Sequence, residues 1–132
     1  WGLLRRQAAA RATSAAIEVN GIVATGPQAR LSDLSGGNQQ KFVIARELGD
    51  DVVVILAGHP TRGLDIRTVV TIRNKIVAER ARGVAILLLS TDLSEVWELS
   101  DRIMVMARGR LHGPVPVSGT TLAEIGRWMT TP

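Results

Sequence analysis

A string of eight residues in the first half of the chain combines two glycines with side chains that can hydrogen-bond. It reads Leu-Ser-Gly-Gly-Asn-Gln-Gln-Lys over residues 34–41 and runs into residues 38–49, whose apolar spacing predicts a helix that begins at the glycines. Glycines let the backbone approach a ligand closely, and the first turn of a helix leaves four amides unpaired at the positive end of its dipole. This arrangement suits a phosphate, with the Ser35 hydroxyl as a further donor and the glutamines able to reach a ribose or neighbouring backbone. For Ser-Gly-Gly alone, an ordinary serine-capped helix is the better explanation.

The full string resembles the signature loop of ATP-binding cassette (ABC) ATPases, in the Asn-Gln-Gln-Lys form of sugar and nucleoside importers that carry two cassettes in one chain. Residues 60–65, Pro-Thr-Arg-Gly-Leu-Asp, resemble the D-loop of that family. Residues 99–106, Leu-Ser-Asp-Arg-Ile-Met-Val-Met, resemble the stretch after its switch region. Order and spacing agree from about residue 1 to about residue 115, so the chain is identified as the C-terminal part of a second cassette.

The family hydrolyses ATP with a Gly-rich P-loop and its lysine, an acidic residue on magnesium, a base that orients water, and a histidine at the γ-phosphate. The chain contains no P-loop string, as expected if that half of the cassette lies upstream of Trp1. Gly58 and His59 stand where the family has Asp-Glu, and Thr91 stands at the switch histidine. His59 as a substitute base would lack the carboxylate that holds magnesium. We therefore expect no catalytic residue, with Gly58, His59 and Thr91 as degenerate positions.

The resemblance also implies which site each residue would serve. In the family two cassettes pack head to tail, so that each ATP lies between the P-loop of one cassette and the signature of the other. The three degenerate positions would belong to this cassette's own P-loop, whereas the retained residues would face the ATP of the partner. The retained, nucleotide-facing residues are Ser35, Gly36, Gly37, Asn38, Gln39 and, in the D-loop, Asp65. This implies an asymmetric pair in which the chain lends its signature to an ATP that the other cassette hydrolyses.

The elements that must position these residues alternate between helices and short strands. Two apolar runs, residues 52–56 and 84–89, have the pattern of strands buried on both faces. Between them, apolar residues recur at helical spacing, with Asp65 as N-cap and Gly83 closing the helix, which predicts a βαβ unit with parallel strands. Other helices are expected over residues 2–17, 94–99 and 120–129, and other strands over 103–107 and 111–115, around Gly109.

We expect an α/β fold: a partial RecA-like P-loop NTPase core, with a mainly parallel sheet and helices, plus the ABC helical subdomain. The helical subdomain would span residues 1–49 and end in the signature loop and its helix. Residues 50–132 would form the C-terminal half of the ATP-binding core. In the family the segment before Asn20 meets the permease, so Trp1, Leu3 and Leu4 are expected to be partly exposed.

Composition argues against several other classes of protein. A chain of 132 residues with 45% hydrophobic residues fits one folded domain, and its apolar runs are far shorter than the roughly 18 residues of a membrane-spanning helix. The lack of cysteine excludes thiolate metal sites, and His59 and His112 lack neighbouring zinc ligands, so no metal site is expected. Despite a net charge of +4, the arginines are interleaved with acids and form no stripe beside aromatic residues. Nucleic acid is therefore not an expected partner.

The resemblance implies a part of the ATP-binding subunit of an importer for a sugar or related solute, bound to the cytoplasmic face of the cell membrane. The expected partners are the other cassette, in the same or an identical chain, and membrane permease subunits. ATP and Mg²⁺ would be bound by the assembled pair of cassettes, and this piece alone would not bind them tightly. Whether the chain itself acts as an enzyme stays open. Two alternatives also remain open: a nucleoside importer and a soluble ABC ATPase of nucleic-acid metabolism.

Overall fold

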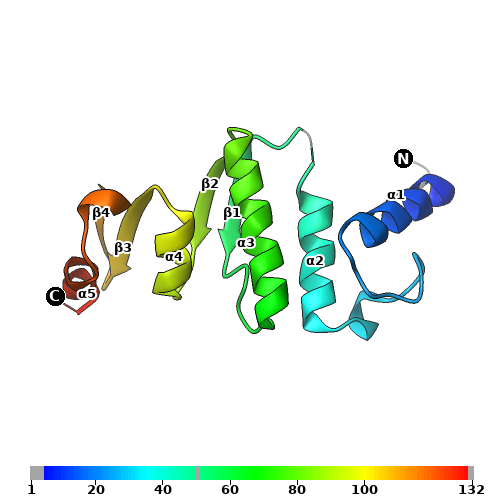
Figure 1. The fold of residues 1–132 in the computed structure, drawn as a ribbon, viewed down its shortest axis with the longest axis horizontal. Coiled ribbons are helices and arrows are strands. Elements are labelled where there is room, and N and C mark those ends of the chain that lie inside the picture. The colour runs from blue at the N-terminus through cyan, green and yellow to red at the C-terminus, as the bar shows by residue number, and fades with distance from the viewer. Residues whose placement is uncertain (1–4, 50, 131–132) are drawn as a thin grey trace. The chain divides into compact units, whose positions relative to one another are not determined.

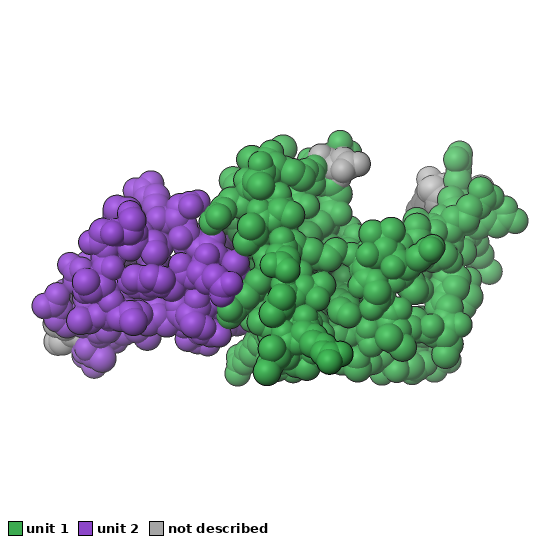
Figure 2. All heavy atoms as spheres, viewed as in Figure 1, with its two compact units in different colours: residues 1–55, 60–86 green, residues 56–59, 87–132 purple. Residues whose placement is uncertain are grey.

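The computed structural model describes residues 5–49 and 51–130, and its chain divides into two compact units (Figure 2). One unit comprises residues 1–55 and 60–86, and the other comprises residues 56–59 and 87–132. Trp1, Leu3 and Leu4, whose exposure was predicted, lie outside the described residues, as does Asp50 at the predicted start of the ATP-binding core. None of the helices in the described part is long and apolar enough to cross a membrane.

The first unit contains three helices and the first residues of two strands (Figure 1). The helices are α1 (Arg6–Val19), α2 (Gly36–Glu47) and α3 (Ile66–Ala81), and one turn of 3₁₀ helix (Leu31–Asp33) precedes α2. Helix α2 contacts both α1 and α3. The signature helix is therefore held between its two neighbours, and the contacts group α3 with the helical segment.

Helix α3 begins and ends where the sequence predicts. Asp65 is its N-cap, with a side chain that accepts from the amide of Thr68. Gly83, at a φ of 87°, follows the last turn in the left-handed conformation that closes helices. On its buried side Ile72 and Ile76 are almost inaccessible to solvent. The predicted helical periodicity, the N-cap at Asp65 and the closing glycine at Gly83 are therefore confirmed for this element.

Strands β1 and β2 form a two-stranded sheet. Their bounds are Val54–Gly58 and Ala85–Leu89. The Ala85 amide donates to the Val53 carbonyl at 3.0 Å, and the His59 amide donates to the Leu89 carbonyl at 2.8 Å. The same chain order at both ends shows that the strands are parallel. With α3 between them, they form the predicted βαβ unit, although β1 begins two residues later than expected.

The prediction that these two strands are buried on both faces is wrong for the described residues. Half-buried and exposed residues alternate along both strands, and Leu56 and Leu89 keep 74% and 51% of their surfaces exposed. A strand is buried on both faces only where other elements cover both sides of its sheet. The described residues bury one face of β1 and β2 more than the other. A continuous run of apolar residues in the sequence therefore did not mean that both faces of the strands are buried.

The second unit is built around an antiparallel pair of strands. Its elements are α4 (Leu93–Leu99), β3 (Arg102–Ala107), β4 (Arg110–Pro116), a 3₁₀ turn (Val117–Gly119) and α5 (Leu122–Thr130). The pairing of β3 with β4 shifts in register between Ile103 and Val105. Helix α5 contacts β3, and its Ile125 packs with these two residues to form the core of the unit. The predicted strands around Gly109 and the closing helix are confirmed.

Candidate functional site

The signature string lies at the N-terminus of α2, in the first unit. Ser35 is the exposed N-cap residue, and Gly36 is the first residue of the helix. The space around Gly36 is open, since an added Cβ would meet no atom within 4 Å. Gly36 and Ser35 are both exposed, so the first-turn amides lie at an open helix start of the kind that suits a phosphate.

Asn38 links the signature serine to the chain before it. Its Nδ2 donates to the Ser35 hydroxyl oxygen at 2.9 Å, while its backbone amide makes a longer bond of 3.5 Å to the same oxygen. Its Oδ1 accepts from the backbone amide of Val23 at 2.9 Å. Both ends of the Asn38 side chain are therefore used inside the protein. Its direct contact with nucleotide remains a prediction.

Gln39 is also engaged within the loop. Its Nε2 donates to the carbonyl of Leu34 at 2.9 Å, across the start of the helix. This bond ties the residue before the N-cap to the first turn, so Gln39 stabilises the loop conformation in this structure. Its contact with the partner's nucleotide remains a prediction, and the Leu34 bond uses only one of the two N–H groups of the Gln39 amide.

The two lysines of the chain meet at one turn. Lys41 on α2 donates to the Gly21 carbonyl at 3.2 Å, and Lys75 on α3 donates to the Asn20 side-chain oxygen. The turn that follows α1 is thus held by side chains from both neighbouring helices. Together with the bond from Val23 to Asn38, these contacts fix the segment behind the signature loop.

The D-loop aspartate lies against the signature loop. An added Cβ on Gly37 would be 3.0 Å from the Thr68 hydroxyl oxygen and 3.4 Å from Asp65 Oδ2. Asp65 Oδ2 in turn accepts from the Thr68 hydroxyl at 2.7 Å, and Oδ1 accepts from the Thr68 amide at 3.0 Å. The structure therefore brings Asp65 and Thr68 near Gly37, where any side chain would be in tight contact with the Thr68 hydroxyl.

The hydrogen bonds at Asp65 also affect its protonation. The Thr68 hydroxyl and then the Thr68 amide hold the pKa of Asp65 below its ordinary value, because they stabilise the ionised carboxylate. Thr68 was missed in the sequence analysis. Its signal was present, since a Thr three residues after an Asp N-cap can bond back to that cap. No sequence signal indicated the role of Val23, which acts through its backbone amide.

The degenerate positions lie in the second unit. Gly58 ends β1, His59 follows it at a φ of 48°, and Thr91 lies two residues beyond the end of β2. Because β1 and β2 are parallel, these three residues lie at the same edge of the sheet. Neither Gly58 nor His59 offers a carboxylate, so the family's magnesium ligand and base have no counterpart here. Within residues 5–49 and 51–130, no group of three His, Asp or Glu side chains is placed to hold a metal ion.

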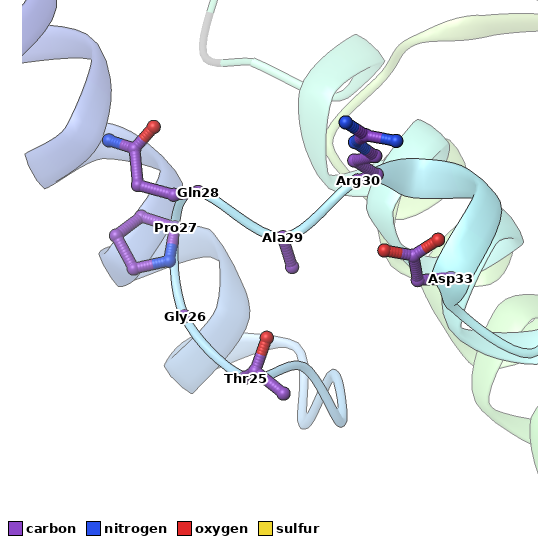
Figure 3. A pocket seen from close by; sticks show the side chains of 7 residues that line it. All are labelled: Thr25, Gly26, Pro27, Gln28, Ala29, Arg30 and Asp33. Atoms are coloured by element: carbon purple, nitrogen blue, oxygen red, sulfur yellow. The ribbon is translucent and has the colours of Figure 1, made fainter.

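A shallow hollow lies in the loop between α1 and α2 (Figure 3). Residues 25–30 and Asp33 line its volume of about 450 Å³, with Arg30 and Asp33 as the charged residues. None of the predicted site residues lines it. The candidate site is therefore the exposed helix start at Ser35 and Gly36, and this hollow is a separate feature.

The fold is that of ATP-binding cassettes. The structure of an inward-facing metal-chelate type ABC transporter matches 90% of this chain and 47% of its own, with a TM-score of 0.73 and 15% identity. The dimeric ABC transporter cassette MJ0796 matches 85% of this chain and 50% of its own, with a TM-score of 0.65 and 22% identity. These likenesses confirm the predicted α/β fold of an ABC cassette. No protein-family model matches the chain.

Curated relatives then identify the family. The guanosine import ATP-binding protein NupO of Bacillus subtilis is 44% identical over 73% of this chain, and the glucose import protein TsgD13 of Haloferax volcanii is 41% identical over 98%. The arabinose import protein AraG of Yersinia pestis is 47% identical over 67% of this chain. The chain spans 19%, 23% and 17% of the lengths of these three relatives. It belongs to the ATP-binding proteins of ABC-type sugar and nucleoside importers.

Proposed function

We propose that the chain is part of the ATP-binding subunit of an importer, and that it presents its signature loop to an ATP held by another cassette. The observation that carries this proposal is the open start of α2, where Ser35 is exposed and nothing lies within 4 Å of a Cβ on Gly36. First-turn amides and a hydroxyl donor at one exposed point suit the γ-phosphate. Asp65, which lies beside Gly37, would join the same surface.

We further propose that this cassette does not hydrolyse ATP at its own site. At this edge of the sheet Gly58 and His59 supply no carboxylate for magnesium, and Thr91 supplies no imidazole at the switch position. A neutral hydroxyl or glycine cannot balance the charge that develops on the phosphate during transfer. ATP, bound with Mg²⁺, would therefore be hydrolysed only at the composite site formed by this signature and the partner's P-loop.

The proposed setting is a pair of cassettes attached to permease subunits at the cytoplasmic face of the membrane. Sugar is the first candidate solute, and the relatives named for glucose and arabinose support it. A nucleoside is the second candidate, because the relative named for guanosine is equally similar over a comparable part of the chain. Uptake of labelled arabinose, glucose and guanosine by the assembled importer, each measured with and without the other two as unlabelled competitors, separates the two classes of solute.

The assignment of roles is tested by comparing three variants of the assembled importer in one membrane preparation. Ser35→Arg places a long cationic side chain where the phosphate must approach and should abolish most ATP hydrolysis and uptake. Ser32→Arg makes the same change at another exposed serine of the same unit and serves as the matched control. His59→Ala should change little, since no catalytic role falls to it. Loss of hydrolysis in His59→Ala together with full activity in Ser35→Arg would reverse the assignment.

A reciprocal experiment addresses the degenerate site. The combined change Gly58→Asp, His59→Glu and Thr91→His restores the family's residues and should leave the ATP turnover at the partner's site unaltered. The remaining alternative, an ABC ATPase of nucleic-acid metabolism, is tested by titrating binding to DNA and RNA with salt. Tight binding that weakens steeply with salt would favour that class over an importer.

A further inference from the structure

The Asn38 side chain occupies a position between the signature serine and the segment before it. It is the third residue of α2, and its carboxamide contacts the Ser35 hydroxyl with one end and the Val23 amide with the other. Asn38 itself is partly buried, whereas the Val23 side chain is 76% exposed. The donor at Val23 is its backbone amide, so any residue except proline could make this bond.

The bond to Val23 determines which way the carboxamide faces. A backbone N–H can only donate, so the atom that meets it at 2.9 Å must be the carbonyl oxygen of Asn38. The NH₂ group is then directed at the Ser35 oxygen, 2.9 Å away. A flipped side chain would place NH₂ against N–H and oxygen against the hydroxyl, and the first of these contacts is repulsive. The orientation is thus set on the side away from Ser35.

This orientation has a consequence for the Ser35 hydroxyl. A serine hydroxyl has two lone pairs and one proton, and here its oxygen accepts from both the Asn38 side chain and the Asn38 backbone amide. Among the hydrogen bonds found in the described residues, Ser35 donates none. The proton of Ser35 is therefore not used by Asn38, and because Ser35 is exposed an incoming acceptor can reach it.

We infer that Asn38 is a positioning residue that keeps the Ser35 hydroxyl a donor toward the phosphate of the partner-held ATP. The inference rests on the proposed function, because the phosphate is the acceptor that this proton would meet. Asn38 acts through Ser35 and does not itself need to touch nucleotide. The orientation of the Asn38 carboxamide also depends on the segment after α1, since movement of Val23 would break its hydrogen bond to Asn38.

The test is a double-mutant cycle on ATP hydrolysis by the assembled importer, with kcat and KM measured separately. Asn38→Asp retains an acceptor for Val23 but offers only an acceptor to Ser35, so the hydroxyl turns inward to donate to the carboxylate. With Ser35 present, ATP hydrolysis should fall at least about tenfold, the lower end of the cost of a lost hydrogen bond to a charged group. With Ser35→Ala, the same change should cost less than about threefold, because only its added charge remains to act.

Two further variants separate positioning from charge and from folding. Ser32→Asp adds the same charge at an exposed position outside the signature string and should have a small effect in both backgrounds. Asn38→Ala removes both contacts but leaves the Ser35 hydroxyl free to rotate, so it should impair hydrolysis less than Asn38→Asp. If Asn38 only stabilised the loop, Asn38→Ala would impair hydrolysis more, because it loses more contacts. It also provides the cycle if Asn38→Asp does not fold.

The outcomes are distinguishable. Equal factors for Asn38→Asp in the parent and in the Ser35→Ala background overturn the inference while leaving the proposed function intact. Full activity in Ser35→Ala alone also overturns the inference, because the hydroxyl would then donate nothing that hydrolysis needs, whereas full activity in Ser35→Arg overturns the proposed function. Protection of the Val23 amide from hydrogen exchange should persist in Asn38→Asp and disappear in Asn38→Ala, and loss of protection in Asn38→Asp would contradict the proposed orientation.

Discussion

Replacing Gly37 with alanine tests the close approach of the signature loop to the D-loop. The new Cβ would lie 3.0 Å from the Thr68 hydroxyl oxygen, which cannot easily retreat because it donates to Asp65 at 2.7 Å. Forcing an extra carbon into a packed contact costs about 1–3 kcal/mol. The alanine regains about 0.5–1 kcal/mol of helix propensity. The free energy of unfolding should therefore fall by about 1 kcal/mol, which lowers the Tm by about 3–5 °C.

The neighbouring glycine provides the control for this prediction. Gly36→Ala has nothing within 4 Å of its Cβ, so it should leave stability unchanged or raise it by up to about 0.5 kcal/mol. In a Thr68→Ala background the clash is absent, and Gly37→Ala should become neutral or stabilising. Thermal unfolding followed by far-ultraviolet circular dichroism measures the parent and the four variants, Gly36→Ala, Gly37→Ala, Thr68→Ala and the combination of Gly37→Ala with Thr68→Ala. Equal effects of Gly36→Ala and Gly37→Ala, or no dependence on Thr68, would refute the reasoning.

Three other predictions concern stability. The pKa of Asp65 is lower in the folded chain than in the unfolded one, so its contribution is complete above about pH 4 and is lost as the pH falls through the folded value; urea unfolding at decreasing pH should show a smaller acid loss in Asp65→Asn than in the parent. Gly113→Ala, at a φ of 100° and with a Cβ 2.7 Å from the Ile103 carbonyl oxygen, should lower the free energy of unfolding by at least about 2 kcal/mol, whereas Gly119→Ala, whose nearest atom is 3.8 Å away, should not. At a φ of 48°, His59→Val should cost about 1–2 kcal/mol and His59→Gly less than about 0.5, measured by the same unfolding assay; a similar cost for both would contradict the left-handed backbone at this position.

Local signals predicted most of the elements. Capping and stop residues such as Ser35, Asp65 and Gly83 act within a few residues of where they stand, so their effects are visible in sequence. Burial was less predictable, because Leu56 and Leu89 are apolar whether or not another element covers them. The boundary predicted between residues 49 and 50 remains a prediction.

The candidate site was predictable in its backbone and not in its contacts. Two glycines before a helix indicate an exposed set of amides from sequence alone, and the structure has Ser35 and Gly36 at that start. The use of the Asn38 carboxamide depends on a backbone amide fifteen residues earlier, and no residue type encodes it. The approach of Gly37 to Thr68 depends likewise on how α2 packs against α3. Contacts between distant segments were thus the part that the sequence did not reveal.

The convergence of both lysines on one turn makes that turn chemically addressable. Fourteen of the sixteen basic residues are arginines, which do not react with amine-directed reagents, so Lys41 and Lys75 are the chain's two side-chain amines. Both engage oxygens of Asn20 and Gly21. Acylation with a small isotope-labelled or fluorescent ester would therefore place reporters on opposite sides of one short segment, without any engineered cysteine. The acylation rate of Lys41 would measure how often its hydrogen bond from α2 to the turn breaks, and the rate of Lys75 would measure the same for the bond from α3.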